Sequence, residues 1–136
     1  MRRTAIVAAA VASAALAAAP AADAASWVLR LKTPRTQPRV NHGWKITVSA
    51  HTRSGRPLRA RAYYQFLYQG QVVSVQYPSP GKPPGTAHKP YRFRGSYSDK
   101  LKFPARSRGI PLTLRVVVKA DRRSTQHRDK RIRVRR

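Results

Sequence analysis

The chain has 136 residues, of which 29 are Lys or Arg and four are Asp or Glu, so its formal net charge at pH 7 is +25. Its length fits one domain with a modest hydrophobic core. Cysteine is absent, which excludes disulfide bonds and thiolate zinc sites. The scarcity of carboxylates argues against two-carboxylate glycoside hydrolysis and against carboxylate-rich calcium or magnesium sites.

The first residues have the pattern of an export signal. Arg2 and Arg3 precede an alanine-rich apolar run without charge before Asp23, and residues 22–24 (Ala-Asp-Ala) supply a small-x-small cleavage site. A membrane anchor is the alternative, but the run is shorter than the roughly 20 residues that cross a bilayer. We therefore expect a signal peptide at residues 1–24, a mature domain at residues 25–136, and a secreted, extracellular or envelope-associated protein with no transmembrane anchor after cleavage.

After this leader, apolar and polar residues alternate in short blocks, which is the period of a strand with one buried face. The first block contains Trp27, Leu29 and Leu31 and ends before two prolines. The second block, residues 44–50, begins with Trp44 and lies between turn-forming segments. Both blocks predict strands.

The third block, residues 62–68, is apolar on both faces, as expected for a central strand. We assign Tyr64, Phe66 and Tyr68 to the core. Residues 69–71 (Gln-Gly-Gln) predict a tight reversal into a strand over residues 72–77, so the two strands form a hairpin.

Residues 78–89 are rich in proline and glycine and predict a long exposed loop, since proline cannot donate to a sheet ladder. Strand pairing resumes around Tyr91 and Phe93 and continues to residue 103. Asp99 lies in phase with the apolar residues of this block, so either a bulge near Gly95 resets the register or the carboxylate is partly buried against an Arg or Lys. We favour the bulge.

Two further strands are expected near the C-terminus. After a loop at residues 105–110, the apolar side chains of residues 111–118 share one face and predict a central strand that includes Leu114 and Val116. Residues 121–129 predict a polar loop, and residues 130–136 predict a last strand with Ile132 and Val134 facing inward.

About seven or eight strands in this length, without a helical segment, indicate a single all-β sandwich of two sheets. A small barrel is the alternative. The proline-rich loop and the two strongly apolar central strands favour the sandwich.

The turn at residues 54–58 (Ser-Gly-Arg-Pro-Leu), followed by Ala60, Ala62, Tyr64 and Phe66, resembles a motif of small secreted bacterial immunoglobulin-like (Ig-like or fibronectin-III-like) domains. In those domains a Gly-x-Pro-aliphatic turn precedes a strand. The resemblance implies an Ig-like β-sandwich and an adhesive, structural or ligand-presenting role without catalytic residues, although a fold does not fix a function. No internal repeat is present, so a role as a tandem spacer is not favoured.

Basic charge is the strongest physical feature, because such a surface attracts polyanions. On the last strand Arg131, Arg133 and Arg135 are expected to project from one face, with about 6.7 Å between successive side chains. The other candidate polyanion-binding residues lie in the preceding loop and around the turn before the third strand: Arg122, Arg123, Arg128, Arg53, Arg56, Arg59 and Arg61.

An exported protein meets teichoic-type polymers, acidic polysaccharides, lipid headgroups and extracellular DNA, whereas intracellular nucleic acid is not expected as a partner. The alternative interpretation is compositional, with Arg serving as the ordinary solubilising residue. The net charge exceeds what solubility alone requires.

The remaining polar residues point to no catalytic or metal chemistry. The four histidines, His42, His51, His88 and His127, lack the close spacing of a metal clasp, and there is no Gly-x-Ser-x-Gly elbow. We expect no enzyme, no cofactor and no metal. The leading hypothesis is an Ig-like domain that associates with the anionic cell envelope or with extracellular polyanions. The alternative is a structural or adhesive module that binds a surface protein through a strand edge or the proline-rich loop.

Overall fold

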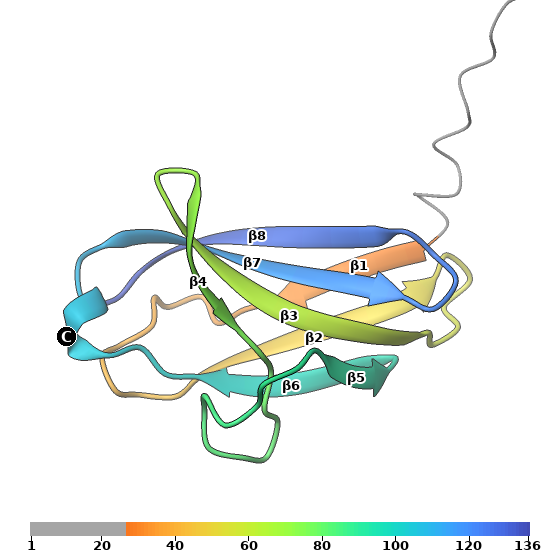
Figure 1. Cartoon of the computed structure of the whole chain (residues 1–136), viewed down its shortest axis with the longest axis horizontal. Coiled ribbons are helices and arrows are strands. Elements are labelled where there is room, and N and C mark those ends of the chain that lie inside the picture. Colours follow the sequence, from red (N-terminus) through yellow and green to blue (C-terminus); the bar gives the residue numbers. More distant parts are fainter. Residues whose placement is uncertain (1–26) are drawn as a thin grey trace, which may run out of the picture.

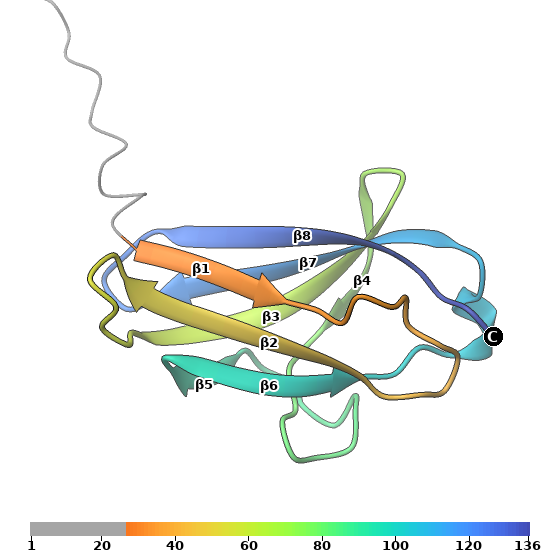
Figure 2. The same ribbon diagram turned by 180° about the vertical axis from the view of Figure 1, so that it is seen from behind.

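The computed structural model describes residues 27–136, which form an all-β fold of two layers (Figures 1 and 2). Its elements are β1 (Trp27–Lys32), β2 (Trp44–Thr52), β3 (Arg59–Tyr68), β4 (Gln71–Gln76), β5 (Tyr91–Arg94), β6 (Ser96–Leu101), a 3₁₀ turn (Ala105–Ser107), β7 (Pro111–Ala120) and β8 (Thr125–Arg133). The smaller sheet has the order β1-β2-β6, and the larger sheet has the order β4-β3-β7-β8 with β5 also paired to β3. The all-β prediction is confirmed.

The predicted signal peptide, residues 1–24, lies outside the described residues. Within residues 27–136, no helix has the length and apolarity that a membrane span requires.

The space between the two sheets is filled by the alternating apolar side chains that the sequence pattern indicated. Trp44, Phe66, Leu114 and Val116 are each at most 5% exposed, and together with aliphatic and aromatic residues of both sheets they form one core. The indole N–H of Trp44 donates to the carbonyl of Thr36 at 3.0 Å, so burial leaves this polar group paired. Packing of this apolar surface holds a chain without disulfide bonds together.

Gly95 is the point where the chain crosses from one sheet to the other. β5 pairs with β3 in the larger sheet, whereas β6, which begins one residue after Gly95, pairs with β2 in the smaller sheet. Gly95 has a φ of +77°, and its N–H donates to the carbonyl of Leu58 at 2.9 Å. A Cβ at this position would lie 3.0 Å from the Cβ of Pro57, so both the conformation and the space require glycine.

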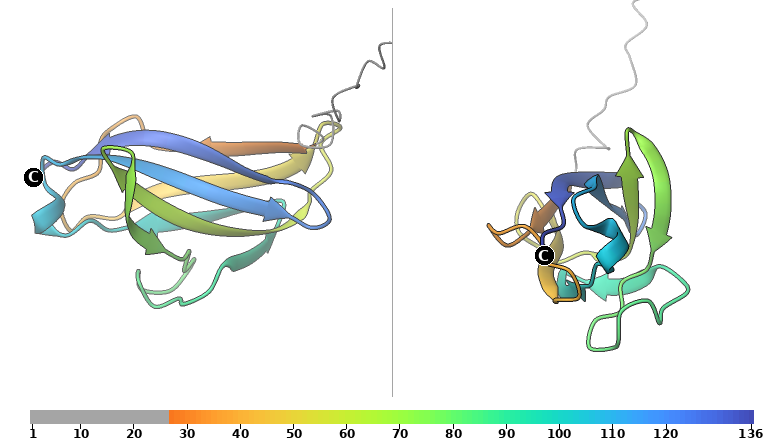
Figure 3. Two further views of the ribbon diagram at one scale, coloured as in Figure 1. Left: turned by 45° about the horizontal axis from the view of Figure 1, so that its top comes forward. Right: turned by 90° about the vertical axis from the view of Figure 1, so that its left-hand side faces the viewer.

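Tyr68 was predicted to be buried, and this is wrong: its side chain is 39% exposed. The β3–β4 hairpin projects beyond the smaller sheet, so no opposing layer covers its tip (Figures 1 and 3). The pairing of β3 with β4 also shifts between Phe66 and Leu67, which leaves Val73 without a partner residue on β3. The alternation of apolar and polar residues could not show where the larger sheet extends beyond the smaller one.

The predicted polar loop over residues 121–129 is also wrong in its second half. β8 already begins at Thr125, and Arg128 and Asp129 pair with residues of β7. The strand lies at the edge of the larger sheet and is polar on both faces over these residues, so it carries no apolar period for the sequence to show.

Asp99 is 5% exposed and keeps the inward phase of Tyr97 and Leu101, so the favoured bulge is wrong. The other alternative, a buried carboxylate, is right about burial but wrong about the partner. The Tyr64 hydroxyl donates to Asp99 Oδ2 at 2.9 Å, and the backbone N–H groups of Ser79 and Lys100 also donate to this carboxylate. Burial raises the pKa of Asp99, and these three hydrogen bonds oppose the rise.

The proline-rich loop is anchored at its beginning. Pro78 and Ser79 are buried, whereas most of residues 80–90 are exposed, as expected. Because the Ser79 N–H donates to Asp99, the loop is tied to the core at the point where it leaves β4.

Candidate polyanion-binding surface

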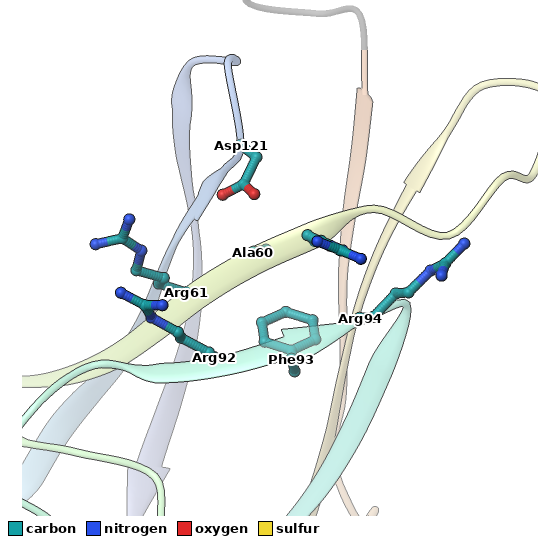
Figure 4. Close-up of a pocket in the computed structure, with 7 residues that line it drawn as sticks. Ala60, Arg61, Arg92, Phe93, Arg94 and Asp121 are labelled. Atoms are coloured by element: carbon teal, nitrogen blue, oxygen red, sulfur yellow. The ribbon is translucent and has the colours of Figure 1, made fainter.

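Four arginines come together where β3 lies beside β5. Arg59 stands opposite Arg94, and Arg61 stands opposite Arg92, on the outer face of the larger sheet. We call these four residues the arginine quartet. They line a hollow of about 320 Å³ with Ala60, Phe93 and Asp121 (Figure 4).

The positive charge of the quartet is not neutralised by any ion pair within the described residues. Within the described residues, none of the four guanidinium groups makes a hydrogen bond or an ion pair. Like charges directly opposite each other on neighbouring strands destabilise a sheet. Asp121 points toward the quartet from the β7–β8 turn but forms no salt bridge with it (Figure 4). The site therefore has an excess of positive charge that a bound anion would relieve.

An arginine elsewhere on the same face is neutralised by the chain itself. Arg115 on β7 stands opposite Asp129 on β8, and the guanidinium donates to both carboxylate oxygens, at 2.9 and 3.0 Å. This hydrogen-bonded pair lowers the pKa of Asp129. Since an Asp can fill a position opposite an Arg in this sheet, the two Arg-to-Arg pairs of the quartet are not forced by the fold.

Two chain reversals add basic residues to the same end of the molecule. The backbone N–H of Asp121 donates to the carbonyl of Arg59 at 2.9 Å, which places the β7–β8 turn beside the quartet. The β2–β3 turn leads directly into Arg59. We call this region the basic end, and it comprises the quartet with Arg53, Arg56, Lys119, Arg122 and Arg123.

Of the three arginines predicted to form the C-terminal stripe, two lie within β8. Arg131 and Arg133 are exposed and point to the outer face of the larger sheet, opposite Thr113 and Pro111. Arg135 is also exposed, but it lies beyond β8 and forms a parallel bridge with Arg39. Arg128 stands opposite Val116 and so faces the core side of this edge strand, where it is nevertheless exposed.

The outer face of the larger sheet is thus basic at both ends and nearly neutral between them. Lys119 of β7 pairs with Arg61, and Thr113 of the same strand pairs with Arg131, so the two basic regions are about 20 Å apart along β7. Tyr63, Val117 and the neutralised Arg115 occupy the middle.

The sequence singled out Arg59 and Arg61 but missed Arg92, Arg94 and Lys119. The alternation of residues 91–94 (Tyr-Arg-Phe-Arg) showed that both arginines face outward. It did not show that this strand lies beside β3, because strand order is a property of the whole fold.

Other polar groups do not converge. Within residues 27–136, no three His, Cys, Asp or Glu side chains are close enough to hold a metal ion. Asp99 is buried and Asp129 is paired with Arg115. The proline-rich loop borders a hollow of about 760 Å³ lined mainly by loop residues, including Lys82, His88 and Lys89.

Fold and surface together define a basic all-β domain of two sheets. No family model matches the chain, and no curated protein matches it by sequence. A DUF4466 family protein from Parabacteroides merdae is similar in structure, with a TM-score of 0.45 and 12% sequence identity. The match covers 79% of this chain and 44% of that one, so this chain spans less than half of the length of that protein.

Proposed function

We propose that this chain is an exported, non-catalytic domain of the Ig-like sandwich class that associates with anionic polymers of the cell envelope or the extracellular matrix. The signal-like residues 1–24 and the turn at residues 54–58 support the export and the class. A mass measurement of the native protein tests the export: the expected N-terminus is Ala25, and an intact Met1 on protein inside the cell contradicts it.

The observation that carries the proposal is the arginine quartet. Two directly opposed Arg pairs destabilise a free sheet, and Asp121, the one carboxylate that lines their hollow, forms no salt bridge with them. An anionic partner turns this repulsion into attraction. Guanidinium groups suit this role because their fork geometry matches phosphate, sulfate and carboxylate groups.

A polymer fits the surface better than a small ligand does. Arg61 and Arg92 lie side by side in Figure 4, whereas Arg94 points to the other side of Phe93, so the guanidinium groups are spread and do not converge on one point. The second basic region around Arg131 lies about 20 Å away, within reach of one extended chain. Repeated anionic groups can occupy both regions and release counterions from each.

The test is salt-dependent retention on an immobilised sulfated polysaccharide and on a phosphodiester polymer. We expect retention to fall steeply as the salt concentration rises, because screening and counterion return weaken such binding. Retention that is unchanged from low to high salt contradicts the proposal.

A matched pair of variants separates a specific surface from general charge. The quartet variant carries Arg59→Gln, Arg61→Gln, Arg92→Gln and Arg94→Gln; the control removes the same charge elsewhere with Arg30→Gln, Arg35→Gln, Arg106→Gln and Arg108→Gln. We expect the quartet variant to elute at clearly lower salt than the control, with a salt slope about three units shallower than the wild type on a single-stranded phosphodiester. An equal loss in both variants favours the compositional interpretation.

A second candidate function is a structural or adhesive module that binds a surface protein. The exposed valines of β4 favour it, because an uncharged strand edge is a common site of protein contact. A pull-down from the native cell surface that recovers no protein at low salt counts against this candidate.

A further inference from the structure

The exposed large hydrophobic side chains of the described chain lie on the β3–β4 hairpin or next to it. They are Tyr68 (39% exposed), Val72 (48%), Val73 (58%), Val75 (48%) and Ile110 (38%), and we call them the hairpin patch. Four belong to the β3–β4 hairpin. The fifth lines, together with Val73 and Phe66, a hollow of about 320 Å³ beside the hairpin. The pairings of Val72 with Leu67 and of Val75 with Gln65 place these two valines on the outer face of the hairpin, whereas Val73 and Ile110 lie on the side of the hollow. A cluster of exposed apolar side chains marks an interaction site more often than scattered single residues do.

The hairpin itself, from Tyr64 to Gln76, carries no charged residue. Residues 62–81 include no Asp, Glu, Lys, Arg or His, although the chain carries 29 basic residues. Among the eight strands that the structure describes, β4 alone has no charged residue. The opposite edge of its sheet, β8, carries Lys130 and Arg131 with further arginines, and charged side chains commonly protect an edge from association.

The hairpin patch combines a projection with a hollow. The hairpin tip projects from the body of the molecule (Figure 3), and the hollow lined by Phe66, Val73 and Ile110 lies next to it. A projection beside a hollow lets two copies related by a twofold axis each place a tip in the hollow of the other. Two chains of net charge +25 repel each other over most of their surfaces, so an uncharged patch is where they can meet.

We propose that two copies of this chain associate through the hairpin patch, with the hairpin tip of each copy packed against the hollow of the other. Side-chain packing carries the contact. A continuous ladder between two β4 strands is not part of the proposal, because the register shift at Val73 interrupts that edge. Lys102 and Arg106 border the hollow, so some repulsion between the copies remains.

This proposal does not rest on polyanion binding, and it predicts the opposite response to salt. Screening reduces the repulsion between the two copies, and apolar contacts do not weaken with ionic strength. Dimerisation should therefore become stronger at high salt, where release from an anionic polymer is expected.

The experiment is sedimentation velocity of the purified chain over a range of concentrations, at low and high salt and without any polyanion. We expect a monomer–dimer equilibrium that shifts toward dimer at high salt. The variant Val73→Lys should raise the dimer dissociation constant by about tenfold or more, since it removes apolar contacts and adds a like charge. The control Thr125→Lys, on the exposed opposite edge of the sheet, should leave the constant within about threefold of the wild type.

A chain that stays monomeric at every concentration and both salt levels overturns the proposal, as does an equal effect of the two lysine variants. Circular dichroism verifies that Val73→Lys is folded. If it is not, Ile110→Lys places the charge on the other side of the hollow and is expected to give the same loss of dimer. Persistence of the dimer in a folded Ile110→Lys variant then contradicts the proposal.

Discussion

The hydroxyl of Tyr64 donates a 2.9 Å hydrogen bond to the carboxylate of Asp99, and this bond joins the two sheets through the core. Tyr64 belongs to β3 of the larger sheet, and Asp99 belongs to β6 of the smaller one. Because Tyr64 has one hydroxyl hydrogen, the 3.1 Å contact between its oxygen and the Tyr97 hydroxyl is donated by Tyr97. The buried polar groups therefore form a directed chain that ends on Asp99.

Replacing Asp99 tests this network. Asp99→Ala should lower the free energy of unfolding by about 1–3 kcal/mol or more, because the buried donors of Tyr64, Ser79 and Lys100 lose their acceptor. Asp99→Asn should be far milder, since an amide can accept from the backbone and donate to Tyr64. Urea denaturation at neutral pH measures both, and equal losses for the two variants would contradict the network.

The titration of Asp99 should contribute to the pH dependence of the unfolding free energy. Its pKa is raised in the folded state, so its contribution is fully present below the unfolded carboxyl pKa and is lost as the pH rises through the folded value. Asp99→Asn removes this term. We therefore expect the stability of Asp99→Asn relative to the wild type to improve from acid to neutral pH, and an unchanged difference across that range would argue against a raised pKa.

Gly95 should tolerate no side chain. Gly95→Ala places a Cβ 3.0 Å from that of Pro57 and keeps a φ of +77°, whereas Gly55→Ala has a φ of +93° with no heavy atom within 4 Å. We expect Gly55→Ala to lower the unfolding free energy by about 1–2 kcal/mol from the backbone term. Gly95→Ala should lose at least about 1 kcal/mol more, because a packed neighbour must also shift. Thermal unfolding of the pair measures the difference.

Strands in which apolar and polar residues alternate strictly could be predicted from the sequence, because this alternation indicates one buried face. Phe66 was assigned to the core, and Trp44 and Leu114 to the apolar faces of alternating strands, and all three are buried. The beginning of β8 could not be found, since it is an edge strand with polar residues on both faces. Tyr68 was misplaced because its exposure depends on the length of the opposing sheet (Figure 3).

Only two of the four arginines of the quartet could be predicted from the sequence, for a related reason. Arg59 and Arg61 stood out as part of a local run of arginines, but their partners Arg94 and Arg92 come from a strand that follows the proline-rich loop. The burial of Asp99 could have been predicted, because it alternates in the sequence with Tyr97 and Leu101 and shares their inward face. What the sequence could not supply was the tyrosine hydroxyl on the opposite sheet.

Arg92→Glu should make the protein more stable and at the same time weaken its retention on a polyanion. The new carboxylate would face Arg61 across β3 and β5, in the same kind of opposed position that Asp129 occupies toward Arg115. Replacing a like-charged pair by an opposite pair should raise the unfolding free energy by about 0.2–1 kcal/mol at low salt. The same change should lower the salt concentration at which the protein elutes from a sulfated polysaccharide. Arg30→Glu, an equal charge reversal opposite Ser49 on the smaller sheet, should weaken retention less and bring no gain in stability. If Arg92→Glu is no more stable than the wild type at low salt, the quartet is not the repulsive cluster that the pairing indicates, and the case for an anionic partner at this site falls with it.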